Sequence, residues 1–199
     1  MATIGMRDLV YSKISLDAET GEESYGAVKK LAKAINADLS VDVAEAILYA
    51  DDGASETAME FAGGTLTLGV DDLTPDVQAD LTGETKDGDE VVSYGEDSGG
   101  YVAVGFRAKK SNGSYRCVWL LKVKFGAPSE SYETKKESID FKTPTIEGKI
   151  MQRTKADSNG KHSWRRYKDC DEEAAQAYLK SVPTGGTSTV STMSLSKGD

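Results

Sequence analysis

The residues best suited to chemistry are few in this sequence, and its single histidine is the first of them. His162 stands beside Ser163 in a glycine-containing stretch. A serine nucleophile needs a histidine base and a sharp turn that exposes the hydroxyl, yet no nucleophile-elbow pattern surrounds Ser163. We therefore expect His162 to be structural or incidental, and we expect that the chain is not an enzyme.

Adjacent acidic residues are the next candidates, because paired carboxylates can bind a metal ion or act as acid and base. They occur at Asp51-Asp52, at Asp71-Asp72 and in the run from Asp87 to Glu90. None has the ligand spacing of a calcium loop, and Asp-Gly is itself a turn dipeptide. Turns or solvated surface are favoured, and an enzyme with a carboxylate pair is the weakest alternative.

The sequence offers little support for a phosphate-binding site or for reactive thiols. Gly63-Gly64 and Gly99-Gly100 open no helix and precede no Walker lysine, so we interpret them as glycines at strand entries. Cys117 and Cys170 are too far apart in sequence for a metal pair or redox motif, and we expect two free thiols. The sequence predicts no cofactor and no metal site.

Composition favours one folded core with an acidic surface. The 199 residues carry 33 acidic and 24 basic side chains, a formal charge of −9, which argues against tight DNA binding. No apolar run is long enough for a signal peptide or a membrane span, so synthesis in the cytoplasm is expected. A basic cluster surrounds Trp164, and we favour a contact with a neighbouring subunit over phosphate binding for its members Lys161, Arg165, Arg166 and Lys168.

Period-two alternation of apolar and polar residues predicts a mainly β fold, either a β-sandwich or barrel-like. The clearest hairpin turns at Asn112-Gly113. After Pro144 the apolar parity shifts, so the strand there should bend. The predicted strands are Leu9–Ile14, Leu31–Val43, Thr65–Asp71, Glu90–Tyr94, Val102–Arg107, Tyr115–Phe125 and Ile139–Ile150.

Two short helices are predicted. The first spans about 74–83, with Thr74 as N-cap, Pro75 in the first turn and Gly83 closing the helix. The second spans Asp171–Lys180 and is too short to be stable without docking. We expect one domain over 1–182 and a Ser/Thr/Gly-rich flexible arm over 183–199.

Several blocks give a family resemblance. They read IGMRDLVYSKI, LAKAINADLSVDVAEAILYADD, GTLTLGVDDL and YVAVGFRAKKSNGSYRCVWLLKVKF through FKTPTIEGKI. Together they cover Ile4 to about Trp164, and this part of the chain resembles the major tail protein family of siphophages and prophages. From Arg165 onward the sequence departs from the family pattern.

The resemblance implies a structural virion protein, a β-sandwich subunit of the bacteriophage tail tube. Its copies would form stacked hexameric rings around a channel for DNA ejection. Its partners would be further copies of itself, the tape measure protein and the tail terminator, with no cofactor and no membrane. DNA would pass through the lumen without specific binding.

If the chain is a tail tube subunit, two of its surfaces have expected roles. The even-numbered side of the strand Leu31–Val43 carries small and acidic side chains, which suit the wall of a channel for polyanionic DNA. We therefore predict that the lumen is lined by Asn36, Asp38, Ser40 and Asp42. The stretch 44–62 lacks clean periodicity and is predicted to be an irregular ring-stacking loop. Its apolar residues need a cover from another copy: Ile47, Leu48, Tyr49, Met59 and Phe61.

An Ig-like β-sandwich module for binding or adhesion remains the alternative, because seven or more alternating strands suit that fold as well. The sequence lacks the Cys and Trp spacing of true immunoglobulin domains. Rings or tubes in electron micrographs favour the tail tube, whereas dispersed monomers favour the binding module.

Overall fold

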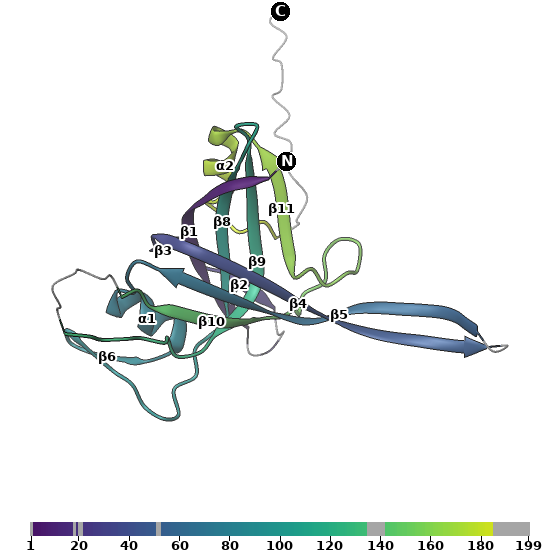
Figure 1. Ribbon diagram of the computed structural model, residues 1–199. Coiled ribbons are helices and arrows are strands. Elements are labelled where there is room, and N and C mark those ends of the chain that lie inside the picture. Colours follow the sequence, from purple (N-terminus) through teal and green to yellow (C-terminus); the bar gives the residue numbers. More distant parts are fainter. Residues whose placement is uncertain (1, 18, 20–21, 51–52, 135–141, 185–199) are drawn as a thin grey trace, which may run out of the picture.

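The fold is mainly β, as the alternation predicts. The computed structural model describes residues 2–17, 19, 22–50, 53–134 and 142–184, with residues 48–50 and 53–55 described in the backbone alone. Figure 1 shows a rolled antiparallel sheet with a long two-stranded ribbon projecting from it. The strands are β1 (Thr3–Leu16), β2 (Glu23–Tyr25), β3 (Lys29–Ala32), β4 (Ala34–Ala50), β5 (Gly53–Val70), β6 (Thr85–Asp87), β7 (Glu90–Val92), β8 (Val102–Lys110), β9 (Tyr115–Phe125), β10 (Thr145–Ile150) and β11 (Arg165–Cys170).

The main sheet closes on itself through one segment. The ladders run in the order β1, β8, β9, β10, β5 and β4, and β3 pairs with β1. Lys33 alone separates β3 from β4, so residues 29–50 pair first with β1 and then with β5. Leucine, valine, isoleucine and aromatic side chains from this circuit fill one core, including Leu9, Leu66, Val104, Leu120 and Ile146.

The predicted strand Leu31–Val43 is therefore two strands with different partners. The backbone of Lys33 is held by Asp71, whose carboxylate accepts from the Lys33 N–H at 2.9 Å and whose own N–H donates to the Lys33 carbonyl at 3.0 Å. Desolvation opposes the charge on Asp71, but the hydrogen bonds from the Lys33 and Asp72 N–H groups, together with the Lys33 charge, outweigh it and lower the pKa of Asp71. This acid pair is thus a turn element, as the sequence indicates.

Both predicted helices exist, the first with the predicted ends and the second shorter than predicted. The helix α1 (Pro75–Thr82) closes at Gly83 with φ 81°, although Thr74 at the N-cap makes no side-chain capping bond. The helix α2 (Glu172–Tyr178) is shorter than predicted, and the Asp171 carboxylate caps it by accepting from the Ala174 N–H at 2.8 Å. Its burial of Ala175 supplies the docking that so short a helix needs.

One carboxylate attaches α1 to the barrel. Asp80 contacts three groups on β1 and β3: the Tyr11 hydroxyl at 2.8 Å, the Lys13 ammonium at 2.6 Å and the Lys29 ammonium at 2.8 Å. Burial opposes ionisation of Asp80, but the hydrogen bonds from these groups outweigh it and hold its pKa well below the usual range. The helix is therefore fixed over one end of the core.

The strands β8 and β9 are buried on both faces. One face lies on the barrel core, and the other packs Ala103, Trp119 and Leu121 under Leu179 beside α2. The Trp119 indole N–H donates to the Tyr178 carbonyl at 3.1 Å. The predicted turn at Asn112-Gly113 joins these strands, with Gly113 at φ 86°.

Three parts of the strand prediction need correction. The strand β11 pairs with β9 but was not predicted, because its residues alternate too weakly in hydropathy. Gly63-Gly64 lies inside β5 rather than at a strand entry. The predicted strand Ile139–Ile150 is too long, because β10 begins at Thr145 and residues 142–144 are not in a strand; residues 139–141 lie outside the described residues. The apolar residues Ile146 and Ile150 of β10 are buried.

Gly64 marks the point where the ribbon leaves the sheet, and it gives the first testable prediction. It pairs with Val41 on one side and Ile150 on the other, and a Cβ there would lie 2.7 Å from the Ser40 carbonyl oxygen. Gly64→Ala should lower the free energy of unfolding by about 1–3 kcal/mol in urea titrations. Gly100→Ala is the control, because its Cβ would meet open space and a change below about 0.5 kcal/mol is expected. Equal effects would contradict the close approach.

Candidate functional site

The stretch 44–62 is the most prominent feature of the surface, and it is not the irregular loop that the sequence predicts. It forms the outer part of the β4–β5 hairpin, which extends beyond the last pairing of β5 with β10, at Gly64 (Figure 1). Register shifts after Asp42 and after Leu48 break the period-two pattern that would have revealed the strands. Both faces of this outer part are also solvent-exposed, so no alternation is imposed by burial.

Pairing sorts the residues of the outer hairpin onto two faces. Directly paired residues of antiparallel strands share a face. Val43 with Phe61, Glu45 with Met59, and Ile47 with Thr57 form one face, which we call the apolar stripe. Ala44 with Glu60 and Ala46 with Ala58 form the opposite face, which is small and acidic.

The apolar stripe is exposed in a single copy. Val43 is 55% exposed, Ile47 43% and Met59 64%. Phe61, at the base, is partly buried because its ring stacks on Trp164 with ring centroids 4.6 Å apart. Three of the five predicted ring-stacking residues, Ile47, Met59 and Phe61, thus share one face. The other two, Leu48 and Tyr49, are described only in the backbone, where they pair with Glu56 and Ala54.

The four predicted lumen residues also lie together. Asn36, Asp38, Ser40 and Asp42 occupy alternate positions of β4, and all four are exposed. The odd-numbered side is buried only in part: Leu31 belongs to the core and Ala37 and Leu39 pack against it, whereas Ile35, Val41 and Val43 are exposed. The register shift near Ile35 and the departure of the ribbon explain these exceptions.

The even-numbered side of β4 continues as one polar face across two more strands. Asp38 pairs with Thr67, which pairs with Glu147 of β10, and Ser40 pairs with Thr65, which pairs with Lys149. The Lys149 ammonium donates to Thr65 Oγ1 and to Glu147 Oε1, both at 2.9 Å. Hydroxyls and carboxylates therefore cover this wall of the sheet, with Lys149 partly balancing the acids.

The basic cluster around Trp164 is divided by β11. Arg165 lies over the rings of Trp164 and Tyr167, at 4.7 and 4.8 Å, whereas Lys168 lies over Tyr178 at 4.6 Å on the other side of the strand. Cation–π contacts within the chain thus use part of the cluster. The backbone of Lys161 is bonded to Asp157, and among the described residues no contact joins Lys161 to these aromatic rings. The predicted subunit contact stays a prediction.

The residues suited to catalysis do not assemble. His162 Nδ1 lies 3.0 Å from the Arg153 carbonyl oxygen, and within the described residues no hydrogen bond joins His162 to a serine. Asp87 and Glu90 pair across the β6–β7 turn, which contains Gly88, as the turn interpretation requires. The described parts of the chain hold no cluster of three or more His, Cys, Asp or Glu side chains suited to a metal ion, and Asp51-Asp52 lies outside them.

The two cysteines are free thiols, as expected. Their sulfur atoms nevertheless lie 3.5 Å apart, on the adjacent strands β9 and β11. Burial, with the neighbouring Cys170, raises the pKa of the Cys117 thiol to about 12. Cys117 is therefore protonated and unreactive at neutral pH.

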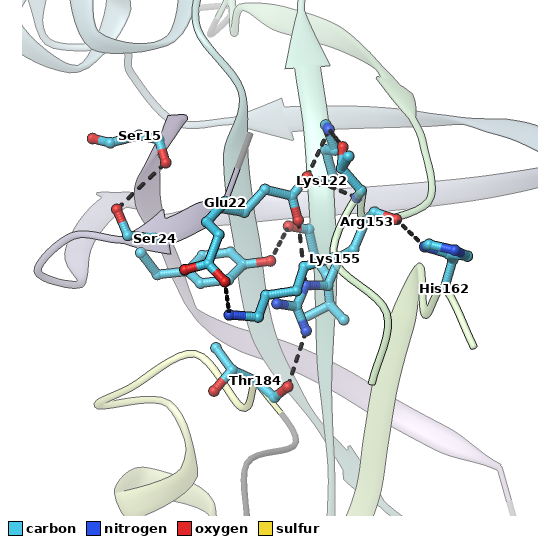
Figure 2. A network of polar contacts seen from close by, with 12 residues as sticks. Ser15, Glu22, Ser24, Lys122, Arg153, Lys155, His162 and Thr184 are labelled. Atoms are coloured by element: carbon cyan, nitrogen blue, oxygen red, sulfur yellow. Dashed lines mark hydrogen bonds and ion pairs between the residues drawn. The ribbon is translucent and has the colours of Figure 1, made fainter. Parts of the chain in front are cut away.

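A buried charged network, which the sequence gives no signal for, connects distant parts of the chain (Figure 2). Glu23 of β2 accepts from the Lys122 ammonium at 2.7 Å and from the Thr154 N–H at 2.9 Å, and the Arg153 Nε lies 3.5 Å from its second oxygen. Arg153 Nη1 in turn donates to the Thr184 carbonyl at 2.9 Å. The network thereby fixes Thr184, the second residue of the predicted arm 183–199 and the last described residue. Residues 185–199 of that arm lie outside the described residues.

Comparisons with known proteins add no family assignment. A scan against protein-family models finds no match, and no curated protein matches the sequence. Among the described residues, no helix combines the length and the apolar character that crossing a membrane requires.

The buried network gives the second prediction. Desolvation opposes the charge on Glu23, but the Lys122 and Thr154 hydrogen bonds outweigh it and lower its pKa. A lowered pKa stabilises the fold above the unfolded value of about 4.3, and this stabilisation is lost as the pH falls through the folded value. Glu23→Gln should therefore destabilise by about 3 kcal/mol at pH 7, with a smaller difference from the parent at pH 3 to 4.

The matched control is Glu22→Gln. Glu22 is exposed and pairs with Lys155 at 2.7 Å, so its loss should change stability by less than about 1 kcal/mol. Urea titrations at several pH values measure both variants. A pH-independent effect of Glu23→Gln would contradict the assigned charge state.

Proposed function

We propose that this chain is a structural subunit of a bacteriophage tail tube, in which copies form stacked rings around a channel. The observation that carries the proposal is the projecting hairpin with its exposed apolar stripe, next to a polar sheet face. An isolated two-stranded hairpin is marginally stable in water, and exposed apolar side chains in a row are costly unless something covers them. A second copy of the chain supplies such a cover.

The polar face supports the same proposal from a different direction. A channel that carries DNA must not retain it, so its wall should lack bulky binding groups and dense positive charge. The face formed by β4, β5 and β10 has small hydroxyl, amide and carboxylate groups, with Lys149 engaged by Thr65 and Glu147. In the proposed tube this face lines the lumen, and virion assembly starts in the host cytoplasm.

The Ig-like binding module is less well supported. In that fold two separate sheets pack face to face. Here β3 and β4 connect the two ends of one sheet, so its ladders form a closed circuit. A closed circuit has few free edges, and among the described residues the outer hairpin offers long strand edges for assembly.

Assembly through the apolar stripe is the third prediction. The parent protein, concentrated after purification, should form rings or tubes in negative-stain micrographs and sediment as large particles. Ile47→Ser combined with Met59→Ser should leave stability within about 0.5 kcal/mol, because both side chains are exposed in the monomer, but should abolish the particles.

The control for this experiment is Ala46→Ser combined with Ala58→Ser, a directly paired position on the opposite hairpin face. It should assemble like the parent. Unimpaired tubes from the Ile47 and Met59 variant would eliminate the stripe as the contact, and a parent that stays monomeric at high concentration would count against the tail tube.

The location of the polar face is the fourth prediction. A tube reconstruction that resolves side chains should place Asn36, Asp38, Ser40 and Asp42 on the channel wall. Asp38→Lys combined with Asp42→Lys should still give tubes, because both side chains are exposed, but these tubes should retain added DNA fragments. Finding the four residues on the outer wall or inside a subunit interface would refute the assignment.

A further inference from the structure

A cavity beside a buried arginine is the second unusual surface feature. Its volume is about 400 Å³, and it lies between β1, β3, β8 and the end of α2. Apolar and basic side chains predominate in its wall, which is formed by Asp8, Val10, Val28, Lys29, Lys30, Arg107, Gln176, Leu179 and Lys180. The polar face and the apolar stripe described above contribute nothing to it.

Arg107 is the chemically distinctive part of this cavity. Its side chain is only 5% exposed. Its Nε donates to the Asp8 carboxylate and its guanidinium lies 4.7 Å from the centre of the Tyr115 ring. Its Nη1, however, makes no hydrogen bond, and the nearest acid, Glu172, is 3.5 Å away. A buried N–H group without an acceptor is unfavourable, so an acceptor that reaches it gains free energy.

The backbone of Asp8, which binds Arg107, adopts an unfavourable conformation. Asp8 is the one non-glycine residue with positive φ, 56°, among the described residues, and it lies where β1 shifts register against β8. Strain of this kind persists where the surrounding structure enforces it, commonly at functional sites. Here it holds the Asp8 carboxylate on Nε, while Nη1 faces the Glu172 carboxylate at 3.5 Å without a hydrogen bond.

The charges define the ligand that the cavity would take. Lys30, Lys180 and Arg107 contribute positive charge to the wall, whereas Asp8 is its only acid. Lys29 also lines it, although it pairs with Asp80. A guanidinium N–H binds a carboxylate through a strong, charge-assisted bond. The expected ligand is therefore a carboxylate on a short apolar surface that can contact Val10, Val28 and Leu179.

The outer hairpin carries such a group. Glu45 is exposed on the apolar stripe, with Val43 and Ile47 two residues before and after it and Met59 paired opposite. The sequence of the β4–β5 hairpin, residues 34–70, contains no Lys or Arg but seven acidic residues. The hairpin thus presents a carboxylate, apolar neighbours and a uniformly negative charge to the basic, apolar-walled cavity.

We propose that the cavity beside Arg107 receives the Glu45 carboxylate of a second copy of this chain. This inference rests on the proposed tube function and names the surface on which the hairpin docks. Figure 1 shows the hairpin projecting away from α2, so one copy does not fill its own cavity. The contact is between two different surfaces, and such heterologous contacts repeat from copy to copy.

The first test compares two acids on opposite faces of the hairpin. Glu45→Gln should raise the protein concentration needed for half-maximal assembly by about tenfold or more, measured by sedimentation. Glu60→Gln, on the face that carries Ala44, should change it by less than about twofold. Equal effects of the two variants would overturn the docking of Glu45.

The second test asks directly which surfaces meet. Chains with Glu45→Cys are mixed with chains with Lys180→Cys, and glutathione disulfide serves as the oxidant. Two thiols then form an interchain disulfide while glutathione is reduced, which gives a dimer on non-reducing gels. Glu60→Cys mixed with Lys180→Cys should give none, and the parent chain shows the background from Cys117 and Cys170.

The outcomes separate this proposal from the tube function. Tubes that form normally with Glu45→Gln and yield no Glu45–Lys180 cross-link overturn the docking site and leave the tube intact. A parent protein that forms no particles overturns the tube itself. A specific cross-link, together with impaired assembly of Glu45→Gln, supports the docking site.

Discussion

The change of partner at Lys33 is the constraint on which the rest of the structure depends. One continuous segment pairs with β1 before this residue and with β5 after it, which closes the sheet. Asp71 fixes the junction by bonding to both the N–H and the carbonyl of Lys33. Because β4 is then committed to β5, its outer half has no third strand beside it and continues with β5 into solvent. The closed core and the projecting hairpin are thus consequences of the same junction.

Sequence patterns predict the parts of this fold where burial is one-sided. The mainly β class is confirmed, as are the β8–β9 turn at Asn112-Gly113 and the helix after Thr74. Alternation fails in the outer hairpin, where the described side chains of both faces are largely exposed and two register shifts interrupt the pattern. The strand β8 is predicted correctly, but the cover over its second face near Ala103 is not.

Sequence patterns also predict one of the two proposed functional surfaces and miss the other. Residue type and spacing place Asn36, Asp38, Ser40 and Asp42 together, because they depend on local strand geometry alone. The cavity beside Arg107 depends on four elements from distant parts of the sequence, and a buried arginine in an alternating strand resembles an ordinary exposed one. Its signal lies in tertiary structure: an unsatisfied N–H, a strained Asp8 and a second layer formed by α2.

The separation of charge along the chain bears on the proposed self-assembly. Residues 34–85 carry acids and no Lys or Arg, whereas basic groups outnumber the one acid in the wall of the cavity by α2. Some of these charges pair within the chain, as Asp80 does with Lys29, but the outer hairpin projects away from α2 and its apolar stripe is exposed (Figure 1). A contact between unlike surfaces leaves each new copy with one surface of each kind still free. In the assembly that we propose, growth would therefore continue until a ring closes or a filament lengthens, and the geometry of the hairpin relative to the barrel would decide which of the two occurs.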